Sequence, residues 1–267
     1  MRDPDDMSLD NGYVSADYLK QVADQLRDFK QLTYQHMAIT PGDTVLDIGC
    51  GPGVDTVPLA ARVGDTGRVI GIDTDEGMLA EARQAARSAG CEARIDHRAG
   101  SALALPLADD SVDSCRAERL LQVVPPEQLG DILKEMLRVT RPGGRVVLAD
   151  TDWASASVDF SDTRLERRLM DFFTCRMRPN GLAGRRLPAL CRELGLQDIR
   201  LDTVAMAKQR LAETPFGDWL TDTAMAQGVI DRTQAAQWQN ELQTRERQQR
   251  FFACVNLVIA SGRKETP

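Results

Sequence analysis

The segment VLDIGCGPGVDT, residues 45–56, constrains the fold more than any other part of the chain. It begins as a buried strand, continues through glycines at positions 49, 51 and 53, and then runs into a helical pattern. Glycine loses more conformational entropy on folding than other residues, so three in one turn indicate a tight turn or a close approach to a ligand. A strand that enters a helix through such a turn presents bare N–H groups and a partial positive charge. We therefore expect a nucleotide-like or carboxylate-bearing ligand at the carboxyl end of this strand.

Strand and helix patterns alternate on both sides of this turn. The predicted strands cover 44–50, 68–73, 93–100, 111–118 and 145–153, and the helices between them cover 54–63, 75–90 and 126–140. Short apolar strands interleaved with helices are typical of a parallel sheet covered on both faces. Two further strand patterns, 198–206 and 253–263, follow later in the chain. We expect an α/β fold with a doubly wound, mostly parallel, seven-stranded sheet.

The expected organisation has three parts. Residues 1–39 form an N-terminal helical arm, residues 40–153 form the ligand-binding core, and residues 154–267 complete the sheet. Two helical inserts interrupt the last part, at about 159–180 and 207–252, and we expect them to cover the pocket for a second ligand.

Composition excludes several classes of function. The formal net charge of -7 and the lack of a basic run argue against nucleic acid as a partner. The six cysteines form no CxxC pair, so we expect neither a metal site nor a disulfide framework, and we interpret them as reduced thiols. No apolar stretch approaches the roughly 18 residues that a membrane span needs. The acidic N-terminus differs from a signal peptide, so we expect a cytoplasmic protein. For the oligomeric state, a homodimer is one of the alternatives that we leave open.

The glycine spacing excludes a dinucleotide fingerprint. The pattern G-x-G-x-x-G would need glycine three positions after Gly51 or Gly53, where the chain has Val54 and Thr56. Asp73, at the end of the next strand, can instead accept hydrogen bonds from both hydroxyls of a ribose. The alternative role for Asp73 is the N-cap of the helix that follows.

Four motifs in order carry a family resemblance over about residues 40–153: VLDIGCGPG, GIDTDEGML, GSALALPLADDSVD and EMLRVTRPGGRVVLAD. The chain resembles the class I S-adenosylmethionine-dependent methyltransferases, in particular the small-molecule branch that includes the ubiquinone and menaquinone methyltransferases. The resemblance implies a Rossmann-like fold and S-adenosyl-L-methionine as the cofactor.

The resemblance also implies which residues bind the cofactor. The glycine turn would contact its amino-acid part with Asp47 near the ammonium group, Asp73 would hold the ribose, and Ser101 would face the adenine where the family commonly has Asp. The implied cofactor-binding residues are Tyr18, Asp47, Gly49, Cys50, Gly51, Gly53, Asp73, Thr74, Met78, Ser101, Ala102, Arg116 and Ala117. The segment from Arg116 to Glu118 would lie under the transferring methyl group.

The remaining candidates concern the acceptor of the methyl group. His36, Glu118 and Asp152 are the candidate general bases, although a lone histidine such as His36 is more often structural. Val123 stands where relatives often have a histidine. The candidate residues of the acceptor pocket are Tyr13, Gln122, Trp153 and Arg176. Tyr13 and Tyr18 either close over the cofactor or pack the N-terminal helix, and Arg176 either grips an anionic acceptor or is solvated.

The function expected from the resemblance is methyl transfer from S-adenosylmethionine to an O, C or N atom of a small, apolar metabolite, such as a quinone-like or secondary-metabolite intermediate. The alternative is a cyclase or regulatory protein that binds the cofactor without transferring its methyl group. The two differ in whether a methyl group leaves the cofactor.

Overall fold

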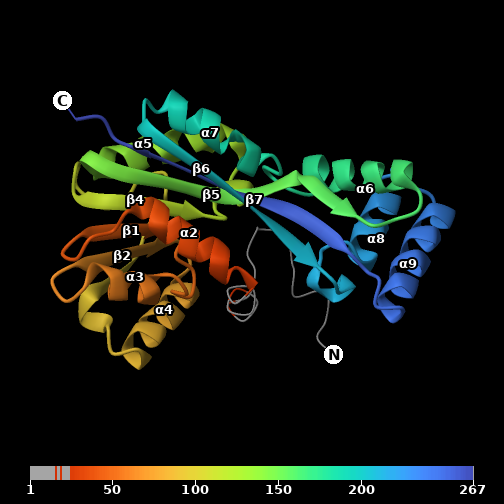
Figure 1. Cartoon of the computed structure of the whole chain (residues 1–267), viewed down its shortest axis with the longest axis horizontal. Coiled ribbons are helices and arrows are strands. Elements are labelled where there is room, and N and C mark those ends of the chain that lie inside the picture. The colour runs from red at the N-terminus through yellow and green to blue at the C-terminus, as the bar shows by residue number, and fades with distance from the viewer. Residues whose placement is uncertain (1–15, 17–18, 20–24, 267) are drawn as a thin grey trace.

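The computed structural model describes residues 25–266 together with residues 16 and 19 (Figure 1). Its centre is a seven-stranded sheet in the order β3-β2-β1-β4-β5-β7-β6. The first five strands in sequence pair in parallel, and β7 pairs antiparallel with both β5 and β6. The strands are β1 Thr44–Ile48, β2 Arg68–Asp73, β3 Ile95–Ala99, β4 Val112–Glu118, β5 Thr140–Val158, β6 Gln197–Lys208 and β7 Ala253–Arg263. The expected mostly parallel, doubly wound sheet is confirmed.

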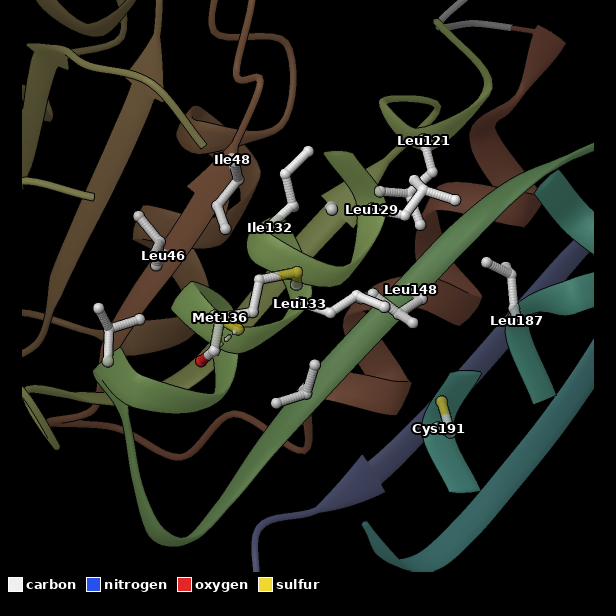
Figure 2. Packing of buried hydrophobic residues seen from close by; sticks show 14 of the residues in the cluster. Leu46, Ile48, Leu121, Leu129, Ile132, Leu133, Met136, Leu148, Leu187 and Cys191 are labelled. Atoms are coloured by element: carbon white, nitrogen blue, oxygen red, sulfur yellow. Dashed lines mark hydrogen bonds between the residues drawn. The ribbon is translucent and has the colours of Figure 1, made fainter. Parts of the chain in front are cut away.

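Helices cover both faces of this sheet. Helices α5 and α7 pack on one face, against alternate strand residues such as Leu46 and Leu148 (Figure 2). Helices α2 and α3 cover the other face, against residues such as Val45 and Val147. The described helices are α2 Arg27–Met37, α3 Thr56–Val63, α4 Glu76–Ser88, α5 Leu129–Val139, α6 Thr163–Arg176, α7 Ala183–Glu193, α8 Asp218–Ala226 and α9 Arg232–Arg247.

A second hydrophobic core lies where β5, β6 and β7 extend past β1 to β4 (Figure 1). Helices α6, α8 and α9 gather around these strand ends, and the fully buried Trp238 and Phe173 fill the space between them. Trp153 of β5 packs edge-on against Phe173, with 5.1 Å between the ring centroids. The predicted helical inserts are therefore present, and they share one core with the extended strands.

The prediction for β5 was wrong at both ends. We expected a strand over 145–153, but pairing runs from Thr140 to Val158. Thr140 already pairs with Val112 of β4, and the amide of Gly143 donates to the carbonyl of Lys264 at 2.9 Å. The far end continues because β7 pairs with it as far as Ala253. Long-range partners, which a local pattern does not reveal, set these bounds.

None of the helices in the part of the chain that the structure describes is long and apolar enough to cross a membrane.

Two helical glycines test how closely α7 approaches β5. A Cβ added at Gly184 would lie 2.6 Å from the amide nitrogen of Asp152, whereas one added at Gly130 of α5 would meet nothing within 4 Å. Gly184→Ala should therefore lower the free energy of unfolding by about 1–3 kcal/mol through overpacking. Gly130→Ala should raise it by about 0.5–1 kcal/mol, since alanine is the better helix former. Urea denaturation measures both changes. A Gly184→Ala protein as stable as the wild type would contradict the close packing.

Candidate functional site

Two adjoining pockets open at the carboxyl ends of β1, β2 and β4. The Lys30 pocket, of about 190 Å³, lies between α2, the glycine turn and the end of β4. The Ser101 pocket, of about 310 Å³, lies between the end of β2, the turn at 100–103 and the segment that follows β4. Both pockets share Gly49, Asp73 and Val123 in their walls. Together they form one crevice at the edge where the sequence predicts a ligand.

The three glycines of the turn have two different roles. All three have positive φ angles, of 72° at Gly49, 51° at Gly51 and 77° at Gly53. Gly49 and Gly51 line the Lys30 pocket, but Gly53 does not. A Cβ at Gly53 would lie 2.9 Å from the backbone of Ala82 in α4. Gly53 therefore has a packing role, because α4 approaches the turn too closely for any side chain, and its contact with the ligand stays a prediction.

Asp73 lies at the junction of the two pockets. Its carboxylate accepts from the amide of Gly51 at 2.8 Å and from the amide of Asp75 at 3.0 Å. The alternative role as helix N-cap falls to Asp75, which accepts from the amides of Gly77 and Met78. Asp73 thus holds the glycine turn in place and keeps its carboxylate in the walls of both pockets.

Most of the other predicted cofactor residues meet in this crevice. Cys50 and Met78 line the Lys30 pocket, and burial raises the pKa of the Cys50 thiol, which agrees with a packing role. Thr74, Ser101 and Ala102 line the Ser101 pocket. Ala117 is fully buried within β4 and lines neither pocket, and its contact with the cofactor stays a prediction. Tyr13 and Tyr18 lie outside the described residues.

A buried ionic cluster lies next to the crevice, centred on the fully buried guanidinium of Arg116. This guanidinium pairs with Asp47 at 2.8 Å and with Asp55 at 3.2 Å, and it contacts Glu118. Its Nε donates to the hydroxyl of Thr33 at 3.0 Å. The Arg116 cluster comprises Lys30, Thr33, Tyr34, Asp47, Asp55, Arg116 and Glu118.

Helix α2 contributes the second cation of the Arg116 cluster. The ammonium of Lys30 lies 2.7 Å from Asp55 and 2.6 Å from Glu118. The hydroxyl of Tyr34 donates to the same Asp55 carboxylate. Lys30, Asp55 and Glu118 also line the Lys30 pocket. We had not anticipated Lys30 or Asp55; the signals in the sequence were the one-turn spacing of Lys30 and Tyr34 and the position of Asp55 directly after the glycine turn.

Two carboxylates of the Arg116 cluster, Asp47 and Asp55, have pKa shifts in opposite directions. Burial raises the pKa of Asp47 to about 6, against the attraction of Arg116. Burial acts in the same direction on Asp55, but Arg116 and Lys30 outweigh it and hold its pKa below the ordinary value. Burial also lowers the pKa of Lys30, although Asp55 opposes this shift.

Two of the predicted cofactor residues lie in this cluster. Asp47, expected near the ammonium group of the cofactor, is 3% exposed and is paired with Arg116. Neither Asp47 nor Arg116 lines the Lys30 pocket or the Ser101 pocket. Their charged groups pair within the cluster, and their contacts with the cofactor stay predictions.

The three candidate bases occupy different places. The ring nitrogens of His36 lie 2.8 Å from the Ser261 hydroxyl and 2.7 Å from the Asp202 carboxylate, on strands β7 and β6. The structure therefore keeps His36 out of both pockets, and its predicted role as a base is corrected to a structural one. Asp152 accepts two hydrogen bonds from Arg185 and lines neither pocket. Only Glu118 reaches the crevice.

The predicted acceptor residues form a link to the second core. Trp153 donates from its indole nitrogen to the side-chain oxygen of Gln122 at 2.6 Å. The amide of Gln122 donates to Asp150 at 3.0 Å, and burial raises the pKa of that carboxyl to about 7. Gln122 precedes Val123, which lines both pockets. Arg176 is exposed at the end of α6 and lines neither pocket, and its role towards the acceptor stays a prediction.

Removing the central cation should show how strongly the Arg116 cluster holds the fold. Arg116→Met leaves three buried carboxylates with only Lys30, so the free energy of unfolding should fall by about 3–5 kcal/mol. The matched control is Arg68→Met, because Arg68 pairs with Asp96 at 2.8 Å but its side chain is 56% exposed. That change should cost less than about 1 kcal/mol. Equal losses in urea denaturation of the two variants would contradict a structural role for the cluster.

Comparison with known proteins identifies relatives along most of the chain. A family described as "Methyltransferase domain" matches residues 45–144. A 37.1 kDa protein in transposon Tn4556 of Streptomyces fradiae is 33% identical over 91% of this chain and 69% of its own length. Methyltransferase GfsG of Streptomyces halstedii is 31% identical over 76% of this chain and 70% of its own length. A 2-phytyl-1,4-naphtoquinone methyltransferase of Synechococcus elongatus is 36% identical, over 46% of this chain and 52% of its own length.

Solved structures share the fold at lower identity. Geranyl diphosphate C-methyltransferase from Streptomyces coelicolor has a TM-score of 0.54 at 17% identity, covering 96% of this chain and 87% of that one. The [4+2]-cyclase SpnF has a TM-score of 0.53 at 22% identity, covering 92% of this chain and 83% of that one. At these identities the likeness concerns the fold alone.

Proposed function

Because the chain belongs to the class I S-adenosylmethionine-dependent methyltransferases, we propose that it methylates an O, C or N atom of a small, apolar metabolite. The observation that carries this proposal is the position of Asp73, at the junction of two pockets beside a glycine turn. A carboxylate there can accept from both hydroxyls of a ribose, with the adenine on one side and the amino-acid part on the other.

The residues of the crevice fit S-adenosylmethionine. A Cβ at Gly49 would come 3.3 Å from the side chain of Leu120, and one at Gly51 would come 3.4 Å from Leu19. Both leucines line the Lys30 pocket, so the two glycines keep this pocket open for a ligand. The bare N–H groups of the turn suit the carboxylate of an amino acid.

We assign the cofactor's parts to the two pockets on this basis. Asp73 would hold the ribose, and Thr74, Ser101 and Ala102 would surround the adenine in the Ser101 pocket. Gly49 to Gly51 and Lys30 would hold the amino-acid part in the Lys30 pocket. The bound cofactor supplies an electrophilic methyl group on a sulfonium.

The chain's own contribution to the reaction is mainly alignment and exclusion of water. Glu118 lines the Lys30 pocket and is held by Lys30, so it can orient an acceptor or take its proton. A positioned base of this kind contributes roughly 10²- to 10⁴-fold to a proton transfer. Asp152, Gln122 and Trp153 would lie on the acceptor side.

An apolar acceptor is supported by two observations. Several relatives whose names specify an acceptor are methyltransferases of 2-phytyl-1,4-naphtoquinone or demethylmenaquinone, whereas another is an arsenite methyltransferase. Aromatic residues of the second core, Trp153 and Phe173, lie next to Gln122 behind the crevice. We propose that the helical inserts α6, α8 and α9 cover the acceptor, although the described lining of both pockets comes from other segments.

The alternative, cofactor binding without methyl transfer, is carried only by the likeness to SpnF, which at 22% identity concerns the fold.

We also propose a cytoplasmic location, which the free thiols of all six cysteines support.

Asp73→Asn should weaken the binding of S-adenosylmethionine about 100-fold, because an amide cannot accept from two ribose hydroxyls and from Gly51 and Asp75 together. Asp75→Asn is the matched control, since asparagine caps a helix as well as aspartate does. Equilibrium dialysis with labelled cofactor measures both constants. Equal affinities of the wild type and Asp73→Asn would contradict the ribose assignment.

Methyl transfer itself is tested with S-adenosylmethionine that carries a ¹³C methyl group. Incubation with small hydroxylated and quinonoid acceptors should give products that contain the labelled methyl, detected by mass spectrometry. Asp73→Asn should reduce the yield in step with its lost affinity. Tight cofactor binding with conversion of an acceptor that gains no label would favour the non-transferring alternative.

A further inference from the structure

The Arg116 cluster contains more negative than positive charge. Its carboxylates are Asp47, Asp55 and Glu118, and its cations are Lys30 and Arg116. All five side chains are at most 11% exposed. With every group ionised, the cluster carries one surplus negative charge that no described cation within salt-bridge distance balances.

The contacts within the cluster show where this surplus resides. Asp55 is held by Lys30, Tyr34 and Arg116, and Glu118 is held by Lys30 and Arg116. Asp47 has a single described side-chain partner, Arg116 at 2.8 Å. A buried charge with so little compensation is costly, and a positive ligand nearby would lower that cost.

We propose that this surplus charge selects the cationic cofactor over its product: S-adenosylmethionine, with its sulfonium, over S-adenosylhomocysteine, a neutral thioether at the same position. This inference rests on the proposed function. The product and the cofactor share the adenine, the ribose and the amino-acid part, so contacts to those parts contribute nothing to the discrimination. The surplus charge of the Arg116 cluster acts on the sulfonium, which is the one feature in which the two ligands differ.

The position of the cluster makes this selection effective. Lys30, Asp55 and Glu118 belong both to the cluster and to the wall of the Lys30 pocket. Charges in a poorly solvated wall act on a ligand with less screening than surface charges do. When the methyl group is transferred, the sulfonium loses its charge, so the site binds the product less tightly. The cluster therefore favours substrate binding and product release at the same time.

The selectivity should depend on pH through Asp47. Burial raises its pKa to about 6, and the charged groups that face it are Arg116 of β4, Lys30 of α2 and Asp55 after the glycine turn, with Glu118 on the far side of Arg116. Below that pKa Asp47 gains a proton and the surplus disappears. Above it the surplus is present, so the preference for the cation should rise with pH.

Isothermal titration calorimetry of the full chain with S-adenosylmethionine and, separately, with S-adenosylhomocysteine tests the proposal. The readout is the ratio of the two dissociation constants. Glu118→Gln removes one negative charge and keeps an oxygen for Lys30, so it should reduce the preference for S-adenosylmethionine roughly tenfold. Asp159→Asn is the control, because the same loss of charge then occurs at a carboxylate that lines neither pocket. It should leave the ratio unchanged.

A second measurement needs no variant. The preference of the wild type should fall as the pH is lowered from about 8 to about 5, and near pH 6 the binding of S-adenosylmethionine should release protons, seen as a dependence of the heat on the buffer. A ratio that is the same in Glu118→Gln and the wild type, or that is constant with pH, would overturn the proposal. Failure of the wild type to bind either ligand would instead overturn the proposed function.

Discussion

The buried guanidinium of Arg116 is the interaction on which the site depends. It joins β4 to Asp47 of β1 and to Asp55 after the glycine turn, and Lys30 extends the same network to α2. Because an uncompensated buried charge is so unfavourable, these elements are held in the one arrangement that pairs the groups. The wall of the Lys30 pocket is part of that arrangement, so the same contacts that stabilise the fold also shape the crevice.

The long strands β5 and β7 divide the molecule into two regions with different tasks. The first half of β5 and the last half of β7 lie in the central sheet, whose carboxyl edge forms the crevice. The end of β5 and the start of β7 support the second core of α6, α8 and α9. The hydrogen bond from Trp153 to Gln122 joins the two regions directly behind the crevice. Changes in the second core can thus reach the crevice without altering the glycine turn.

The sequence predicted the parts of the structure that depend on local patterns. Strand and helix alternation identified the sheet, and the glycine turn with Asp73 identified the crevice, because each is encoded within a few residues. Lys30 and Asp55 escaped notice because their roles arise from pairing across 25 residues of chain. His36 was expected near the crevice because α2 precedes β1, but the helix directs its ring towards Ser261 and Asp202. In each of these cases, contacts between segments that are distant in sequence determine where the side chain lies.

The most direct test of the account is a crystal structure of the protein with S-adenosylhomocysteine. The account predicts one ligand that spans both pockets, with its ribose hydroxyls on the Asp73 carboxylate, its adenine beside Ser101 and Ala102, and its amino-acid part between the glycine turn and Lys30. A ligand bound elsewhere, or a ribose without contact to Asp73, would contradict the account.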